Sequence, residues 1–216
     1  MKTAIVIGAT GLVGNELLQL LFNDSRFEKV IVFARRTTGY ANSKLTEHII
    51  DFDKPEEWIH LVKGDVLFSA LGTTIKQAGT KENQYKIDHT YQYRFAEAAS
   101  KNGVPVYVLV SSAGADVKSS VFYSRMKGEL ERDVRVLNFA SIYFIQPSLL
   151  AGERKENRIG EKVGYATLNF INRLGILKKY RPIQGKTVAQ AMINCSIKAE
   201  KGIHTVTLGK VFEMAE

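Results

Sequence analysis

The sequence predicts an α/β protein with a doubly wound, mostly parallel sheet that carries helices on both faces. Two observations predict this class. Short, continuously apolar runs alternate along the chain with helical patterns, as expected when parallel strands are buried on both faces. In addition, a glycine-rich turn, GATGLVG at residues 8–14, connects the first apolar run to the first helical pattern. We therefore expect repeated strand–turn–helix units.

The apolar runs give the expected strands, and the periodic patterns between them give the expected helices. We expect strands near Thr3–Ile7, Val30–Ala34, Glu47–Ile50, Val66–Ala70, Val106–Ser111, Ile142–Gln146 and His204–Leu208. We expect helices at about Leu12–Phe22, Pro55–Val62, Lys81–Lys101, Phe122–Leu137, Ala166–Arg173 and Val188–Ala199. Asn102-Gly103 ends the longest helix in the manner of a C-cap.

The domain organisation predicted is a single domain over residues 1–216. A chain of 216 residues fits one domain of ordinary size, and its 45% hydrophobic content is sufficient for a core. The regular alternation stops between residues 146 and 186, in a polar, glycine-punctuated stretch followed by a helical pattern. We interpret this stretch as a small excursion that covers a substrate. A plain surface loop is the alternative.

Composition and charge bear on location and partners. No run of 18 apolar residues is present, and the chain enters a strand at once, so neither a membrane span nor a signal peptide is expected. Cys195 is the only cysteine, which predicts a cytoplasmic protein without an intrachain disulfide. The net charge of +8 is spread along the chain without a nucleic-acid-binding motif, so no nucleic-acid partner is expected.

The glycine turn predicts a phosphate site. A helix N-terminus presents unpaired N–H groups and partial positive charge, and glycine lets a phosphate approach the backbone. Gly8, Gly11 and Gly14 follow a GxxGxxG spacing rather than the usual GxGxxG. With a strand before it and a helix after it, this turn predicts a Rossmann-type fold whose first helix holds a pyrophosphate.

The ends of the next strands indicate which dinucleotide is bound. NAD-binding proteins usually carry a carboxylate after the second strand, whereas Arg35 and Arg36 stand there in this chain. Guanidinium groups suit phosphate oxygens, so the sequence predicts NADP(H), with the 2′-phosphate held by both arginines. Asp51 follows the third strand, where adenine is expected to lie. Leu71 and Gly72 follow the fourth, where glycine permits close approach of a ligand.

A possible catalytic group lies after the fifth strand. Tyr123 and Lys127 are four residues apart at the start of a helix and therefore share one face. A free phenol titrates near pH 10, and a neighbouring ammonium favours the phenolate. Ser111 and Ser112 end the fifth strand, and a hydroxyl at this place could orient a substrate carbonyl. The spacing leaves both serines open as candidates.

The glycine turn, the serine-ended strand and YxxxK together resemble the short-chain dehydrogenase/reductase superfamily, in its atypical or extended branch. Further motifs are similar to the family of the human Tat-interacting, metastasis-suppressor oxidoreductase, over about residues 3–200. These motifs lie at Leu71–Gly79, Ser111–Asp116, Tyr123–Glu131 and Glu153–Glu161. This sequence departs from that family at Gln146, where relatives often carry Arg.

The resemblance implies an NADPH-binding Rossmann fold and a set of site residues. It places the pyrophosphate at Thr10, Gly11, Leu12 and Val13, within the turn from Gly8 to Gly14, and the 2′-phosphate at Arg35 and Arg36. It lines the cofactor with Leu71, Gly72, Leu150 and Arg158, and it places Tyr123 and Lys127 at the nicotinamide ribose. The register of the superfamily's catalytic hydroxyl favours Ser112 over Ser111.

The function predicted is an NADPH-dependent oxidoreductase of the carbonyl reductase or dehydrogenase type. Tyr123 would exchange a proton with the oxygen of a small carbonyl substrate, which Ser112 would orient. Lys127 would lower the pKa of the Tyr123 phenol and hold the ribose. An NADPH-sensing regulatory protein without turnover is the main alternative, because a fold does not fix a function. An epimerase or dehydratase that retains its cofactor ranks lower. No metal site is expected, and a homodimer is left open.

Overall fold

A computed structural model describes residues 1–151 and 181–216, which form a seven-stranded, wholly parallel sheet. The strand order is β3-β2-β1-β4-β5-β6-β9. The strands are β1 (Lys2–Ile7), β2 (Phe27–Ala34), β3 (Leu45–Ile49), β4 (Val66–Ser69), β5 (Val106–Val110), β6 (Ser141–Gln146) and β9 (Gly202–Thr207). The order reverses between β1 and β4, so a crevice is expected at the carboxyl ends of these two strands.

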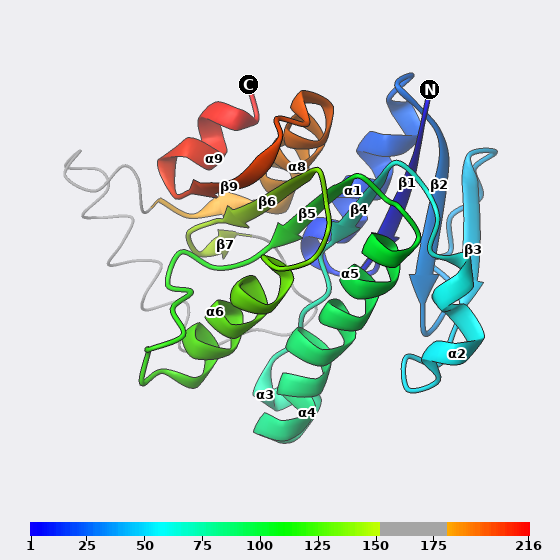
Figure 1. Ribbon diagram of the computed structural model, residues 1–216. Coiled ribbons are helices and arrows are strands. Elements are labelled where there is room, and N and C mark those ends of the chain that lie inside the picture. Colours follow the sequence, from blue (N-terminus) through cyan, green and yellow to red (C-terminus); the bar gives the residue numbers. More distant parts are fainter. Residues whose placement is uncertain (152–180) are drawn as a thin grey trace.

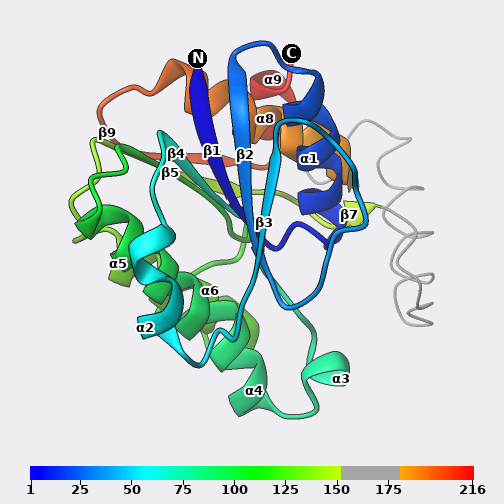
Figure 2. The ribbon, with the colours of Figure 1, turned by 90° about the vertical axis from the view of Figure 1, so that its right-hand side faces the viewer.

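Helices cover both faces of this sheet (Figures 1 and 2). One face carries α1 (Leu12–Asn23), α8 (Gly185–Lys198) and α9 (Gly209–Met214). The other carries α2 (Pro55–Trp58) with a 3₁₀ helix (Ile59–Leu61), α5 (Gln92–Lys101) and α6 (Phe122–Val134). The chain also forms α3 (Ile75–Ala78), α4 (Lys81–Tyr85), a π-helix (Lys86–Tyr91) and a two-residue pair of strands, β7 (Leu150–Ala151) and β8 (Ile183–Gln184).

The central strands are buried on both faces, which explains their continuous apolar sequence. In β1, Ala4 and Val6 belong to the core under α1 and α8, whereas Ile5 and Ile7 belong to the core under α5 and α6. All four side chains are fully buried. This alternation follows from the two-residue period of a strand, and it makes a one-residue slip in register costly.

The predicted fold class is confirmed, and each of the seven expected strands is present within a few residues. Four features were not predicted: the short helices α3 and α9, the β7–β8 pair, and the π-helix that interrupts the expected helix Lys81–Lys101. These elements are two to six residues long, too short to give a periodic pattern. The expected helix Ala166–Arg173, and most of the expected excursion at 146–186, lie outside the described residues. In the part of the chain that is described, no helix has the length and apolarity to cross a membrane.

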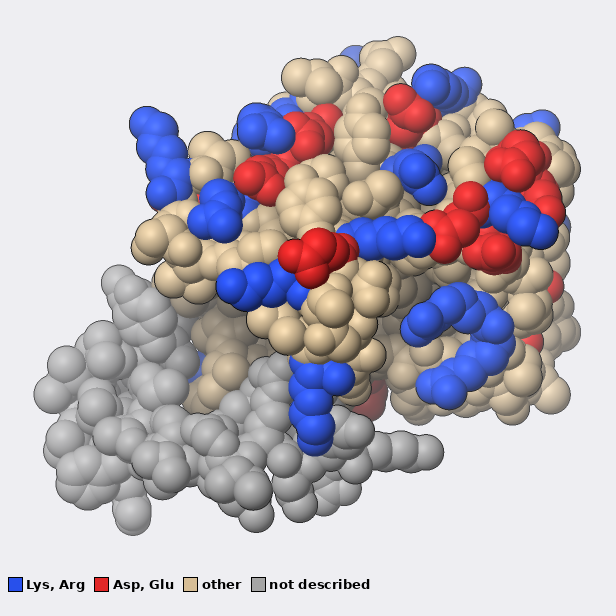
Figure 3. Space-filling view, turned by 90° about the horizontal axis from the view of Figure 1, so that it is seen from below, with Lys and Arg blue, Asp and Glu red and all other residues tan. Residues whose placement is uncertain are grey.

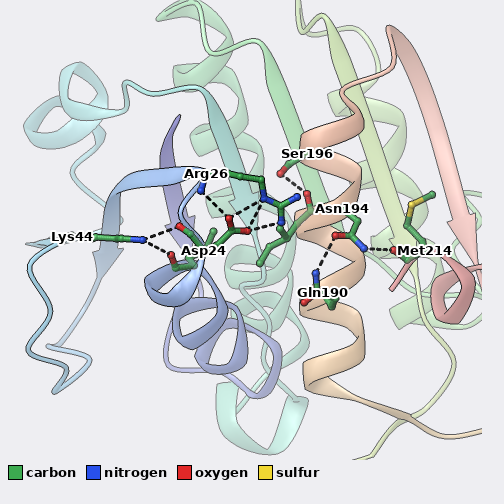
Figure 4. A network of polar contacts seen from close by, with 9 residues as sticks. Asp24, Arg26, Lys44, Gln190, Asn194, Ser196 and Met214 are labelled. Carbon is green, nitrogen blue, oxygen red and sulfur yellow. Dashed lines mark hydrogen bonds and ion pairs between the residues drawn. The ribbon is translucent and has the colours of Figure 1, made fainter. Parts of the chain in front are cut away.

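At the amino-terminal edge of the sheet, polar groups bind one another (Figure 4). Asp24 and Arg26 form an ion pair of 2.6 Å just before β2. Lys44, just before β3, donates from Nζ to the carbonyl oxygens of Leu21 (3.4 Å) and Asp24 (2.8 Å), so it binds the C-terminal end of α1. Nearby, the Asn194 amide of α8 donates to the Met214 carbonyl at 2.8 Å and thereby fixes α9.

Candidate cofactor site

The glycine turn is closed by backbone contacts that exclude side chains. Gly8 has φ +81°, and a Cβ on it would lie 2.3 Å from the backbone of Ala70 and Leu71. A Cβ on Gly14 would lie 2.1 Å from the carbonyl oxygen of Gly8. The N–H of Gly11 donates to that same oxygen at 3.0 Å. Gly8 and Gly14 are therefore required by packing, while Gly11 is exposed at the start of the helix.

The N-terminus of α1 is available to an anion. Gly11 is its N-cap, no side chain caps it, and its first turn holds no acidic residue. Thr10 and Gly11 are exposed and Leu12 is half-buried, whereas the Val13 side chain is buried in the core, so Val13 can offer only its backbone. The structure thus brings the predicted pyrophosphate residues together on one turn. This arrangement fits the phosphates of a dinucleotide.

Arg35 and Arg36 follow β2 directly, and both are exposed. Neither guanidinium forms an ion pair with any residue in the described ranges. The next residues are anchored by Glu47 of β3, which accepts from Thr37 Oγ1 and from the Thr38 N–H, each at 2.8 Å. Two basic side chains without an acidic partner suit a phosphate.

Glu47 was missed by the sequence analysis, although it shapes the loop after the arginines. Burial alone would raise the pKa of Glu47, but hydrogen bonds from Thr38 and Thr37 outweigh it and lower that pKa. The carboxylate is therefore ionised, and it accepts its hydrogen bonds from the two threonines. The register that sets Glu47 beside Val32 of β2 makes these contacts possible, and no local motif indicates it.

Asp51 lies in the exposed turn after β3. Its carboxylate accepts from the Asp53 N–H at 2.9 Å, and its carbonyl accepts from Trp58 Nε1 at 3.0 Å. Asp51 thus shapes the turn at the predicted adenine end.

Leu71 is half-buried and Gly72 is exposed, and both lie on the loop after β4. The nearest atom to a Cβ on Gly72 would be Asp88 Oδ2 at 3.8 Å, so this position is open.

Buried polar residues on the long helix, which the sequence analysis did not single out, fix the loop after β4. Asp88 Oδ1 accepts from the Thr73 N–H at 2.7 Å, and Gln84 Nε2 donates to the Thr73 carbonyl at 3.2 Å. Gln92 Oε1 accepts from Ser69 Oγ at 2.6 Å. Gln84, Asp88 and Gln92 are spaced by four residues around the π-helix, and this polar i, i+4 spacing could have indicated them.

The two serines after β5 have different surroundings. Ser111 is buried, and its Oγ donates to Glu131 Oε1 of α6. Gln146, at the end of β6, donates from Nε2 to the same oxygen at 2.9 Å. Ser112 is half-buried, and its hydroxyl has no hydrogen bond to the described residues. A serine hydroxyl has one proton to donate, so Ser111 is occupied and Ser112 is available.

Tyr123 and Lys127 lie on the first turns of α6. Tyr123 is 40% exposed, whereas Lys127 is only 3% exposed. The Lys127 ammonium has neither a hydrogen bond nor an ion pair with the described part of the chain. The helix is held against the loop after β5 at Gly128, where a Cβ would lie 2.4 Å from Asp116 and Val117. A lysine this buried, whose ammonium has no partner in the described part of the chain, fits a site where a ligand supplies acceptors, such as ribose hydroxyls.

The predicted groups lie at the carboxyl ends of the strands, the edge seen in Figure 3. Lys and Arg side chains are spread over this face among Asp and Glu. Leu150 lies in β7 and pairs with Ile183 of β8. The start of α8 backs the glycine turn, because a Cβ on Gly185 would lie 2.8 Å from the Leu12 carbonyl oxygen. Arg158, the remaining predicted residue, lies outside the described residues.

Two hollows elsewhere on the described surface do not coincide with these groups. One, of about 490 Å³, is lined by Arg26, Asn194, Lys198, Lys210 and others. The second, of about 360 Å³, lies beside it around Gln184, Gln190 and Phe212. Arg26 and Asn194 are already bound within the network of Figure 4. Across residues 1–151 and 181–216, no group of His, Cys, Asp and Glu could hold a metal ion.

Comparison with known proteins decides the family. The model of the NAD(P)H-binding family matches residues 8–138, which include the glycine turn, both arginines, Tyr123 and Lys127. The chain belongs to this NAD(P)H-binding family. It is 35% identical over 210 residues to protein fmp52, mitochondrial, of Aspergillus niger, covering 94% of this chain and 90% of that one. It is 34% identical to FMP52 of Candida albicans, covering 97% and 93%.

Solved structures share the fold. MoeE5 in complex with UDP-glucuronic acid and NAD has a TM-score of 0.73 at 18% identity, covering 96% of this chain and 76% of that one. A short-chain dehydrogenase/reductase superfamily protein from Agrobacterium tumefaciens, with bound NAD, has a TM-score of 0.72 at 14% identity, covering 96% and 77%. At these identities the matches show the fold alone. The resemblance to the metastasis-suppressor oxidoreductase family stays a prediction.

The prediction of a cytoplasmic protein is wrong. Relatives about 35% identical over most of the chain are named mitochondrial proteins. The prediction rested on Cys195, which is fully buried between the sheet and α8. A lone buried cysteine excludes an intrachain disulfide but does not distinguish one reducing compartment from another.

Proposed function

We propose that this protein is an NADPH-dependent oxidoreductase that transfers hydride between the nicotinamide and a small carbonyl substrate. The observation that carries the proposal is Lys127, a residue 3% exposed whose ammonium has no partner in the described chain, one helical turn after the exposed Tyr123. A buried charge of this kind is costly unless a ligand completes it. Membership of an NAD(P)H-binding family supports the cofactor as that ligand.

Two parts of the chain would hold the phosphates of the cofactor. The N-terminus of α1 would hold the pyrophosphate, with Gly11 allowing its close approach. Arg35 and Arg36, exposed and without acidic partners in the described ranges, would hold the 2′-phosphate and so select NADPH over NADH. When bound, the nicotinamide supplies or accepts the hydride.

At the reacting end, three side chains have distinct roles. Tyr123 would donate its phenolic proton to the carbonyl oxygen during reduction and take it back during oxidation. The Lys127 ammonium would hold the ribose hydroxyls beside Tyr123. The Ser112 hydroxyl, which has no hydrogen bond to the described residues, would donate a hydrogen bond to the carbonyl oxygen and orient it.

Cofactor preference is tested without a substrate. We would titrate the protein with NADPH and with NADH and follow nicotinamide fluorescence. We expect NADPH to bind at least tenfold more tightly, because paired guanidiniums bind the extra phosphate through charged hydrogen bonds. Arg35→Ala should remove most of this preference. Arg132→Ala, at an exposed arginine paired with Asp133, is the control and should keep it. Equal binding of both cofactors by the unaltered protein would contradict the proposal.

The chemical step is tested next with a panel of small aldehydes and ketones. NADPH consumption should be measured for the unaltered protein and for Tyr123→Phe. We expect Tyr123→Phe to lower kcat by a factor of about 10² or more, the usual contribution of a general acid. Full activity in this variant would refute the assignment of Tyr123. Tight NADPH binding without turnover of any carbonyl would instead favour a regulatory protein that senses NADPH.

A further inference from the structure

Three polar side chains, two buried and one half-buried, meet around a residue one helical turn after Lys127, and the proposed chemistry uses none of them. They are Glu131 of α6, Ser111 after β5 and Gln146 at the end of β6. Glu131 is 6% exposed and Ser111 is 4% exposed. A single oxygen, Glu131 Oε1, accepts from both Ser111 Oγ and Gln146 Nε2. The cluster therefore joins one helix to the ends of two neighbouring strands.

A carboxylate in this position needs a reason, because burying it is costly unless hydrogen bonds compensate. Apolar residues would join α6 to the sheet at lower cost, and Leu130 and Val134 of the same helix already do so. The carboxylate adds direction, because hydrogen bonds to a charged acceptor fix distance and angle more strictly than apolar contacts do. Glu131 therefore fixes how α6 is rotated on the strand ends.

The rotation of α6 matters for the residue one turn earlier. Lys127 and Glu131 are four residues apart, so they lie on the same face of the helix. A small rotation of α6 would move the Lys127 ammonium away from the strand ends.

The same contact decides between the two serines. Ser111 has one hydroxyl proton, and its hydroxyl donates that proton in a hydrogen bond to the Glu131 carboxylate, which can only accept. Ser111 cannot then donate to a substrate carbonyl, whereas Ser112 can.

We propose that Glu131 is a positioning residue of the cofactor site, which orients Lys127 through α6 and holds Ser111 in a structural role. This inference rests on the proposed function, since it assumes that Lys127 holds the cofactor. Gln146, where the resembling family often has Arg, supplies a neutral donor to the same carboxylate.

The test compares NADPH binding by three variants, followed by nicotinamide fluorescence, with thermal unfolding measured on the same samples. Glu131→Ala should weaken NADPH binding about tenfold or more, the scale expected from loss of hydrogen bonds to a charged group. Glu131→Gln should stay within about threefold of the unaltered protein, because its amide oxygen can still accept from both donors. Glu129→Ala is the matched control. Glu129 lies two residues earlier on α6, and its carboxylate interacts electrostatically with Tyr85 rather than with Ser111 or Gln146.

The outcomes separate this inference from the proposed function. A lower melting temperature for Glu131→Ala with unchanged NADPH affinity would mean a purely structural role and would overturn the inference. Failure of the unaltered protein to bind NADPH would overturn the proposed function, and this inference with it. If Glu131→Ala does not fold, Ser111→Ala decides. We expect NADPH binding about threefold weaker there, from loss of one of the two hydrogen bonds, and unchanged affinity would overturn the inference.

Discussion

The two edges of the sheet differ in whether their lysines and the ends of α1 have partners in the described chain. At the amino-terminal edge, Asp24 binds Arg26, and Lys44 binds the carbonyl end of α1. At the carboxyl edge, the N-terminus of α1 has no side-chain cap, and Lys127 has no partner in the described chain. Satisfied groups stabilise the fold, whereas unsatisfied ones lower its stability until a ligand arrives. The comparison thus separates a structural edge from a functional one.

The largest expected effect comes from filling the glycine turn at the functional edge. Gly8→Ala combines a positive φ with a Cβ 2.3 Å from the backbone after β4. Gly79→Ala is a matched control, because Gly79 has φ +85° but no atom within 4 Å of its Cβ. We expect Gly79→Ala to cost about 1 kcal/mol of unfolding free energy. Gly8→Ala should cost about 3 kcal/mol or more and abolish NADPH binding. Chemical denaturation measures both, and equal costs would contradict the packing argument.

The next effect should have opposite signs in stability and binding. Lys127→Met removes a buried charge and keeps most of the side-chain volume, so the unfolding free energy without cofactor should not fall. NADPH affinity should fall at least tenfold, or about 1.4 kcal/mol, because the acceptors of the ligand lose their donor. Thermal unfolding with and without NADPH measures both quantities. Unaltered affinity would show that Lys127 does not contact the cofactor.

The structural edge should show the reverse behaviour. Lys44→Met removes the donor to the Leu21 and Asp24 carbonyls, and we expect a loss of about 0.5–1 kcal/mol in unfolding free energy. NADPH affinity should not change, because Lys44 precedes β3 at the opposite edge of the sheet. A weakened affinity in this variant would break the distinction between the two edges.

The smallest effect concerns pH. The hydrogen bond from Arg26 outweighs burial and lowers the pKa of the Asp24 carboxyl. A carboxyl with a lower pKa in the folded state binds fewer protons than in the unfolded state. It therefore stabilises the protein above its unfolded pKa, about 3.9, and loses this contribution as the pH falls through the folded pKa. Because Arg26 is half-exposed, Asp24→Asn should cost under about 1 kcal/mol at pH 7 and nothing at pH 2. An equal cost at both pH values would exclude the ion pair as the cause.

Local patterns predicted most of the fold. Continuous apolar runs identified the strands, because a strand buried on both faces needs apolar residues at every position. The glycine turn identified the start of α1, because only glycine tolerates the backbone contacts found at Gly8 and Gly14. Short elements such as α9 and the β7–β8 pair were not predicted, because a few residues are too short to show a hydrophobic period.

The sequence by itself determined the fold class, the glycine turn and the residue types of the candidate site. Each of these depends on neighbours along the chain or on a fixed period. Only the tertiary structure decided which serine is occupied, that Glu47 holds the loop after the arginines, and that Lys127 is buried without a described partner. These facts depend on strand register and on how α6 lies against β5 and β6, and such long-range contacts leave no local signature in the sequence.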